Sequence, residues 1–232
     1  MNINSVKRVF ASVRSIINLN IREFGLDGSN AFSGTYMPDR RDAPKRKPIP
    51  DEMLKVIQSE CQITDDEPRW LIALISDTGM RLSEAAGLSK DDVCLYADVP
   101  YVDIKPHSWR RLKTAGSQRK VPLVGLSLWA AKQACTASNS AFLFPRYCDE
   151  KECHSNSASA ALNKWLKQVA GSDYVIHSFR HSMRDRLRAV NCPSDMIDQI
   201  GGWSSGKVGE GYGDGYSITR KKDALLGIVI SN

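Results

Sequence analysis

The chain has 232 residues, of which 42% are hydrophobic and 25% are charged, a balance that is ordinary for a globular protein. This length allows one good-sized domain and a fragment of another, and the formal net charge is +6. No apolar run approaches the ~20 residues that cross a bilayer, and the first residues lack the apolar core of a secretory signal. We therefore expect a cytoplasmic protein with no membrane partner.

Apolar side chains recur at helical spacing from residue 5 to residue 24, and Gly25 is a natural helix stop. A polar segment with several prolines and a basic cluster follows, which is typical of a linker. Because one helix cannot build its own core, we interpret residues 1–25 as the last helix of a truncated N-terminal domain. Residues 26–49 are interpreted as a basic linker.

A second unit begins at Pro50, which suits the first turn of a helix. The apolar periodicity predicts helices at 51–60, 67–78, 81–88, 125–136, 157–170, 177–190 and 194–201. Between residues 93 and 123 the pattern changes to that of strands, with residues 113–118 as a turn. The sequence therefore predicts that residues 50–232 form a mainly α domain with a small antiparallel β-sheet, an α+β fold.

The six cysteines include no C-x-x-C pair. Cys148, Cys153 and His154 lie close in sequence, but their spacing matches no common zinc pattern and no second pair of ligands accompanies them. We expect reduced, structural thiols, and neither a metal nor a cofactor.

Two motifs place cations at defined positions. In "RLSEAAGL", Arg81 and Glu84 lie three residues apart, so on a helix the carboxylate can hold the guanidinium. In "KTAGSQRKVPL", Lys113 lies in the turn of a short hairpin, where its side chain can extend away from the sheet. Each motif alone also fits an ordinary surface ion pair or a solvated turn lysine.

A third motif, "HSFRH", places His177 and Arg180 three residues apart on one helical face. Like charges disfavour protonation of the histidine, whereas an anion bound between the two side chains favours it. A histidine of the core remains the alternative. His181 points off that face and is expected to be structural.

The fourth motif is "GGWSSGKVGEGYGDGY", residues 201–216, which contains Trp203, Tyr212 and Tyr216. Taken together, the motifs supply two arginines, a lysine, a histidine, an indole N–H and a tyrosine. This set suits attack on a phosphodiester, because fixed guanidiniums neutralise the charge of the transition state. A base can activate a tyrosine nucleophile, and a lysine can protonate the departing alkoxide without any metal.

In this order, R-x-x-E, a hairpin lysine, H-x-x-R, GGW and a tyrosine nine residues later, the motifs resemble the tyrosine recombinases, or phage integrases. The resemblance covers about residues 50–220. It implies the catalytic-domain fold of that family of DNA breaking-rejoining enzymes. It also implies a site-specific recombinase that cleaves DNA through a covalent 3′-phosphotyrosyl intermediate, for integration or excision of a phage or mobile element.

The resemblance also implies a role for each residue. Arg81 and Arg180 would grip the scissile phosphate, and Lys113 would be the general acid to the 5′ oxygen. His177 would assist proton transfer, and Trp203 would take the second histidine-or-tryptophan position. Tyr212 would be the nucleophile, since it lies nine residues after Trp203, and Tyr216 would be a bystander. The complete set is Arg81, Lys113, His177, Arg180, Trp203 and Tyr212, with Glu84 supporting Arg81.

Positive charge concentrates in residues 105–120 and 180–188. In the context of the resemblance, the expected DNA contacts in these stretches are Lys105, Arg110, Arg111, Arg119, Lys120 and Arg184. Residues 1–25 would then be the tail of the DNA-clamping domain. The implied partners are double-stranded DNA, three further copies of the chain in a tetramer, and accessory DNA-bending proteins.

Residues 218–232 include an apolar run, 224–230, which would dock on a neighbouring copy or pack on its own domain. Two alternatives for the function stay open. One is a DNA-binding module that keeps the fold but has lost catalysis. The other is a DNA relaxase like the type IB topoisomerases.

Overall fold

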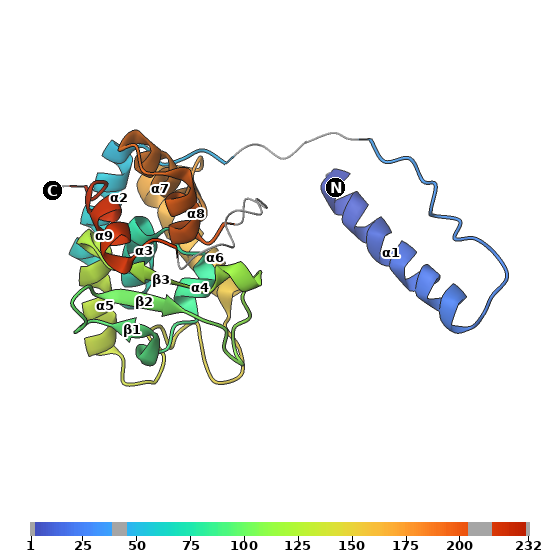
Figure 1. Cartoon of the computed structure of the whole chain (residues 1–232), viewed down its shortest axis with the longest axis horizontal. Coiled ribbons are helices and arrows are strands. Elements are labelled where there is room, and N and C mark those ends of the chain that lie inside the picture. Colours follow the sequence, from blue (N-terminus) through green and yellow to red (C-terminus); the bar gives the residue numbers. More distant parts are fainter. Residues whose placement is uncertain (1–2, 39–45, 204–214, 231–232) are drawn as a thin grey trace. The chain divides into compact units, whose positions relative to one another are not determined.

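The computed structural model describes residues 3–38, 46–203 and 215–230. The chain divides into two compact units, Met1–Lys45 and Arg46–Asn232, which Figure 1 shows in colours that follow the sequence. Within the described residues, none of the helices combines the length and the apolar character needed to cross a membrane.

The first unit contains one long helix, α1 (Ile3–Glu23), and a segment that folds back on it. The Asn30 side chain donates hydrogen bonds to the Arg14 carbonyl and to Asn18 Oδ1, and the Phe10 and Phe32 rings meet edge to face. No residue of α1 is buried, and Ile16 remains 61% exposed. The identification of this unit as the tail of a DNA-clamping domain stays a prediction.

The second unit contains eight described α-helices. They are α2 (Asp51–Thr64), α3 (Glu67–Thr78), α4 (Leu82–Ala86), α5 (Gly125–Ala137), α6 (Ser155–Ala170), α7 (Ser178–Ala189), α8 (Ser194–Gly201) and α9 (Ile218–Leu226). Three strands, β1 (Val93–Cys94), β2 (Tyr101–Ile104) and β3 (Arg119–Pro122), form an antiparallel sheet in the order β1-β2-β3. The prediction of a mainly helical domain with a small antiparallel sheet is confirmed.

Helix α3 is the centre of the core. Five successive residues, 71–75, are fully buried, as expected for a helix whose apolar side chains cover every face. The Asp66 side chain accepts a hydrogen bond from the Arg69 amide at its start, and Gly79 ends it in the left-handed conformation. Because α3 packs against α2, α5 and α7, the residues that follow Gly79 are fixed at the centre of the domain.

The sheet covers the core through alternating side chains. Val102 and Ile104 of β2 are fully buried, whereas Tyr101 and Asp103, which alternate with them, are partly exposed. Val102 pairs with Val93 of β1 and with Val121 of β3. The connection between β2 and β3, residues 105–118, is longer than the short hairpin turn that the sequence predicts. It contains its own turn, in which the amides and carbonyls of His107 and Arg110 bond to each other.

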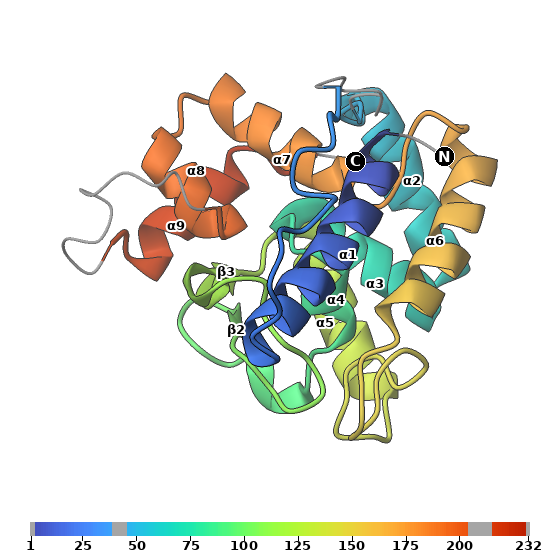
Figure 2. The same ribbon diagram turned by 90° about the vertical axis from the view of Figure 1, so that its right-hand side faces the viewer.

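Figure 2 shows α8 and α9 beside β3; α9 packs against that strand, and α7 packs against α8. Helix α9 was not predicted. Leu225 in it and Ile228 after it are buried, and Arg186 of α7 donates a hydrogen bond of 2.7 Å to the Ile228 carbonyl. Leu225 and Ile228 thus pack on the chain's own domain, and the docking of the apolar run 224–230 on a neighbouring copy stays a prediction.

A buried carboxylate joins α3 to three other segments. Asp77 is 2% exposed and accepts hydrogen bonds from the Leu126 amide at 2.8 Å and from the Gln58 side chain at 3.0 Å. Its other neighbour is the Arg186 guanidinium, at 3.9 Å. Burial raises the pKa of Asp77, and Arg186 together with these hydrogen bonds opposes that rise. Asp77 thus anchors the start of α5 and the arginine that holds the C-terminal segment.

We predict that Asp77→Ala lowers the free energy of unfolding by about 3–5 kcal/mol, because it leaves Arg186 buried without its counter-charge. Urea denaturation measures this change. The matched control is Asp185→Ala, which removes an exposed ion pair with Arg188 and should cost about 1 kcal/mol or less. Equal losses in the two variants would contradict the anchoring role.

Candidate active site

The site is built around Glu84 of α4. The Glu84 side chain is 2% exposed and contacts two guanidiniums, those of Arg81 and Arg119. One carboxylate oxygen accepts from the Arg81 side chain, and the other accepts from Arg119 Nη2 and from the Arg81 amide, each at 2.9 Å. Burial alone would raise the pKa of Glu84, but Arg119 and Arg81 outweigh burial and lower it. Glu84 is therefore ionised and fixes both arginines.

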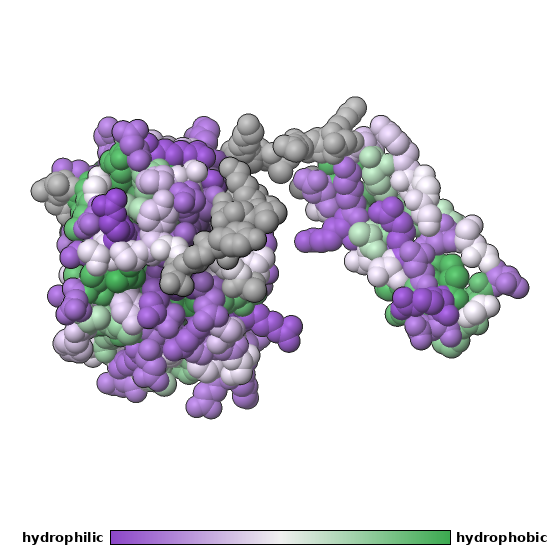
Figure 3. All heavy atoms as spheres, in the orientation of Figure 1, coloured by the Kyte–Doolittle hydropathy of each residue, from purple (hydrophilic) through white to green (hydrophobic). Residues whose placement is uncertain are grey.

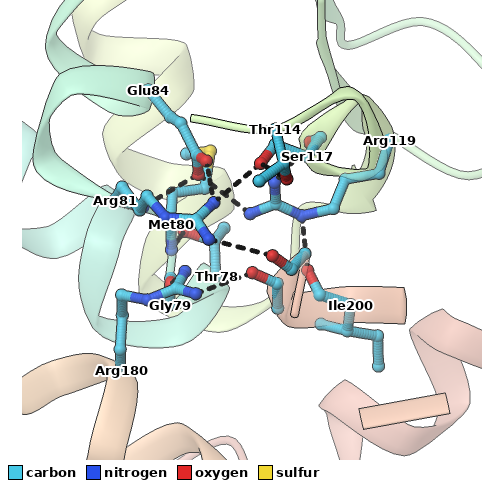
Figure 4. Close-up of polar contacts among 12 residues, drawn as sticks. Thr78, Gly79, Met80, Arg81, Glu84, Thr114, Ser117, Arg119, Arg180 and Ile200 are labelled. Atoms are coloured by element: carbon cyan, nitrogen blue, oxygen red, sulfur yellow. Dashed lines mark hydrogen bonds and ion pairs between the residues drawn. The ribbon is translucent and has the colours of Figure 1, made fainter. Parts of the chain in front are cut away.

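The end of α8 also binds the arginines, through its backbone carbonyls. Three successive carbonyls accept one guanidinium each: Ile200 from Arg119 Nε at 2.7 Å, Gly201 from Arg180 Nη2 at 2.8 Å and Gly202 from Arg81 Nη2 at 2.9 Å. Carbonyls at a helix C-terminus carry partial negative charge and have no partner within the helix. Figure 4 shows the three guanidiniums pointing toward one another between α4, β3 and the end of α8.

Arg180 is 3% exposed and also donates to the Gly79 carbonyl at the end of α3. Burial first, and then the neighbouring charges of Arg81 and Arg119, lower the pKa of Arg180 to about 9. Arg180 is therefore still protonated at neutral pH. Two of its five N–H groups are used by carbonyls, so others remain for an anion.

The glycines of "GGW" allow this packing. A Cβ on Gly201 would lie 1.9 Å from the Trp203 ring. Gly202 has φ +64°, and a Cβ there would lie 2.6 Å from the Arg119 guanidinium. The Trp203 ring in turn lies against two cations, with 4.5 Å from its centre to Arg180 and 4.8 Å to Arg184. The Trp203 ring thus packs on the Arg180 guanidinium.

This cluster carries a surplus of positive charge. It contains the guanidiniums of Arg81, Arg119 and Arg180 and one carboxylate, that of Glu84. The nearby Arg184 is balanced by Asp198 at 3.1 Å. A site that holds two more positive than negative charges within the protein is stabilised by an anion. The Arg81 side chain, 20% exposed, connects the cluster to solvent.

His177 lies immediately before α7 and is exposed, with its ring edge to face against that of His181 at 5.4 Å. Displacement of water around the imidazole, followed by the charges of Arg46 and Arg180, lowers the pKa of His177 to about 4. The imidazole is therefore neutral at pH 7 in the free protein. It is not a histidine of the core, the alternative that the sequence left open.

The structure places the other predicted residues as follows. Lys113 is exposed on the connection between β2 and β3, and Ser117 of the same connection accepts a hydrogen bond from Arg81 Nη1 at 3.3 Å. This hydrogen bond links the segment of Lys113 to the arginine cluster. Tyr212, the predicted nucleophile, lies outside the described residues.

Two of the arginines predicted to contact DNA, Arg110 and Arg119, are buried in the structure. Arg110 is 3% exposed and donates to the carbonyls of Glu84 and Lys105. Arg119 is 8% exposed and belongs to the cluster on Glu84. Both guanidiniums are bound to the protein itself, so we correct their predicted role from DNA contact to support of α4 and of the cluster.

The remaining four predicted contacts are partly or fully exposed. Lys105 pairs with Asp92 at 3.2 Å, Lys120 lies over the Tyr101 ring, and Arg111 is exposed. Arg184 is 31% exposed beside Trp203. Arg111 and Lys120 are exposed, whereas Lys105 and Arg184 are partly exposed and paired with Asp92 and Asp198, so a role of the four in DNA contact stays a prediction. Figure 3 shows hydrophilic side chains over much of one face of the second unit.

Sequence reasoning missed Lys221 and the attachment of Tyr216. Lys221 of α9 is partly buried, and burial, with the charge of Arg119 second, lowers its pKa. Tyr216 is attached to α8, since its amide donates to Gln199 Oε1 at 3.0 Å and its hydroxyl to the Asp195 carboxylate. No local pattern indicates either contact, because both join segments that are distant from the arginine motifs in sequence.

We predict that Gly201→Ala displaces the Trp203 ring from Arg180 and lowers the free energy of unfolding by about 1–3 kcal/mol, the usual cost of overpacking. Urea denaturation followed by tryptophan fluorescence measures both effects. The control is Gly116→Ala, since a Cβ there meets no atom within 4 Å, and it should stay within about 0.5 kcal/mol of wild type. A Gly201 variant as stable as this control would contradict the packing argument.

We compared the chain with known protein families and solved structures. The family model described as "Phage integrase family" matches residues 50–214. No curated protein matches significantly. Among solved structures, the chain is similar to the integrase of transposon Tn1549 in complex with transposon right-end DNA, at 17% identity and a TM-score of 0.62, with 97% of this chain and 75% of that chain covered.

Two other solved structures are similar. One is the lambda integrase in a tetramer bound to a Holliday junction, at 13% identity and a TM-score of 0.62, covering 90% of this chain and 61% of that one. The other is the integrase of mycobacterium phage Brujita, at 13% identity and a TM-score of 0.61, covering 98% and 73%. Likeness at this identity shows the fold, and the expected catalytic-domain fold is confirmed. Because the family model matches most of the length of this chain, the chain belongs to the phage integrase family, the tyrosine recombinases.

Proposed function

We propose that the protein is a site-specific DNA recombinase that cleaves and rejoins DNA through a 3′-phosphotyrosyl intermediate, in the integration or excision of a phage or mobile element. The observation that carries this proposal is the arginine cluster. Glu84 and the Gly202 carbonyl hold Arg81, and the Gly201 carbonyl holds Arg180 at the same helix end, with unbalanced positive charge. A phosphodiester is the anion that DNA would bring to such a cluster.

In this reaction the Tyr212 hydroxyl attacks the phosphorus, its proton leaves to His177, and the bond to the 5′ oxygen breaks. Lys113 gives that oxygen a proton, and the 3′ phosphate stays on the tyrosine. Arg81 and Arg180 balance the charge on the non-bridging oxygens. Rejoining runs the same steps in reverse with the 5′ hydroxyl of another strand as the attacking group.

The neutral state of His177 supports its role as the proton acceptor. A base with a pKa near 4 accepts a proton poorly, but a bound phosphate favours the protonated form and raises the pKa toward the pH of the reaction. The substrate would thus create the basicity that its own cleavage needs.

The environment of Tyr216 supports Tyr212 as the nucleophile. The Tyr216 hydroxyl bonds to the Asp195 carboxylate at 3.1 Å, and this bond, followed by burial, raises the pKa of Tyr216. The Tyr216 hydroxyl is thus bound to α8 rather than directed to the arginine cluster. Tyr216 instead attaches the chain to α8 four residues after Tyr212.

The proposed partners are double-stranded DNA, other copies of the chain in a tetramer, and accessory DNA-bending proteins. Exposed Arg111 and Lys120, with Lys105 and Arg184, are the proposed contacts to the DNA backbone. Because such contacts release counterions, we expect binding to weaken steeply with salt.

We predict that the protein forms a covalent adduct with a nicked suicide substrate carrying its attachment site, seen on a denaturing gel. Tyr212→Phe should abolish the adduct, because no other hydroxyl replaces the nucleophile. The matched control is Tyr216→Phe, which should keep it. An adduct that survives Tyr212→Phe would overturn the assignment.

The same assay separates the two alternative functions. Salt-sensitive DNA binding without any adduct would indicate a module that has lost catalysis. An adduct together with relaxation of supercoiled plasmid of any sequence would indicate a DNA relaxase.

For His177 we predict a pKa near 4 in the free protein and a higher value when a DNA duplex is bound, measured by NMR titration of the imidazole. Arg46→Ala should also raise it, because a neighbouring cation is removed, whereas Lys132→Ala on the exposed side of α5 should not. Since the unfolded histidine protonates near 6.5, His177 lowers the stability of the fold as the pH falls from 6.5 toward 4. A titration near 6.5 in the free protein would contradict this account.

A further inference from the structure

A small hairpin lies between α5 and α6, outside the arginine cluster. Its two arms meet in a single antiparallel bridge, Cys148 with Cys153, and Asp149 Oδ1 accepts the amides of Lys151 and Glu152 at the tip. This tip holds the two cysteines opposite each other.

The backbone hydrogen bonds around the two cysteines show which type of antiparallel residue pair they form. The His154 amide donates to the Tyr147 carbonyl at 2.8 Å, and the Asp149 amide donates to the Glu152 carbonyl at 3.2 Å. These bonds flank the two cysteines on both sides, so Cys148 and Cys153 form a non-hydrogen-bonded pair of an antiparallel ladder. In such pairs the Cα atoms lie roughly 4.5 Å apart and the side chains are closest.

That spacing falls within the range that a disulfide spans, about 4.4–6.8 Å between Cα atoms, and near its lower limit. A disulfide near a geometric limit stores strain and is reduced more readily than a relaxed one. Both thiols are free in the structure, and the two residues lie opposite each other in the pair. The geometry therefore suits a bond that forms and breaks.

The two thiols differ in a way that gives each a role. Cys148 is 1% exposed, whereas Cys153 is partly exposed. The neighbouring Cys148 thiol, followed by the charges of Arg110 and His154, lowers the pKa of Cys153 despite burial. The neighbouring Cys153 thiol and burial raise the pKa of Cys148. The thiol that a reagent can reach is therefore that of Cys153, with Arg110 near it to favour the thiolate, and the buried Cys148 thiol lies opposite it.

We propose that Cys153 and Cys148 form a reversible redox pair, in which Cys153 reacts with a small disulfide of the glutathione type and Cys148 resolves the product. This site is independent of the proposed recombinase chemistry. It borders that region, since Cys153 Sγ lies 3.8 Å from the Ser83 carbonyl in α4 and Arg110 donates to the Glu84 carbonyl.

The reaction balances in two exchanges. The Cys153 thiolate attacks one sulfur of glutathione disulfide, a mixed disulfide forms, and one glutathione leaves as its thiolate. Cys148 then loses its proton and attacks Cys153 Sγ, and the second glutathione leaves. The protein loses two protons and two electrons, and glutathione disulfide is reduced to two thiols.

The test uses the full chain with excess glutathione disulfide, acid quenching, alkylation of the remaining thiols, and tryptic mass spectrometry. Trypsin cuts after Arg146, Lys151 and Lys164, so the two cysteines fall in different peptides, YCDEK and ECHSNSASAALNK. We expect these peptides joined, lighter than their sum by two hydrogen atoms, and separated again by dithiothreitol. We also expect alkylation of reduced Cys153 roughly tenfold faster than that of Cys148.

Three variants give the controls. Cys148→Ser should stop the reaction at a stable glutathione adduct on Cys153, and Cys153→Ser should give neither adduct nor joined peptides. Cys135→Ser should leave the joined peptides unchanged, since Cys135 lies in α5 outside the hairpin. Wild type that keeps the glutathione adduct, or that joins peptides only between two chains, would overturn the proposal, and neither result depends on a variant folding.

Discussion

The arrangement of the site depends on the last turn of α8, where the carbonyls of residues 200, 201 and 202 each accept one guanidinium. Helix C-termini attract cations, but three cations in one place repel one another by about 4 kcal/mol per pair at 4 Å and an effective dielectric constant of 20. Glu84 offsets part of this repulsion, because its carboxylate binds Arg81 and Arg119 from the opposite side. The helix end and the single carboxylate together make a cluster that is stable when empty and still unbalanced in charge.

The need to hold three guanidiniums at one helix end explains the spacing of the sequence motifs. Arg81 and Glu84 are three residues apart because the first caps α4 and the second reaches back to it. Gly201 and Gly202 leave room for the Trp203 ring and for the Arg119 guanidinium at the same turn. Farther away, Asp77 ties α3 to α5 and to Arg186, which keeps Gly79 in place to bind Arg180. Residues that never meet a phosphate thus set the positions of those that would.

Local spacing was enough to predict most helices, the small sheet and the pairing of Arg81 with Glu84, because these depend on periodicity and on neighbours in the chain. It was not enough for Arg110 and Arg119, which look like exposed basic residues in the sequence. Their burial depends on Glu84 and on backbone carbonyls that the fold brings near them. Helix α9 was missed for a similar reason. Its apolar residues are too few to predict a helix from the sequence, and the helix is stabilised by packing on β3.

Helix α8 also bounds the segment that contains the proposed nucleophile. On one side the Trp203 amide donates to the Asp198 carbonyl, and on the other the Tyr216 amide donates to the side chain of Gln199, the next residue of the same helix. Tyr212 precedes Tyr216 by four residues, so their Cα atoms are at most about 14 Å apart. The element that orients the guanidiniums therefore also limits where the tyrosine can reach. In the proposed reaction, α8 thus has two roles: its last carbonyls orient the guanidiniums that would bind the phosphate, and its side chains and backbone hold the residues on either side of the segment that contains the nucleophile.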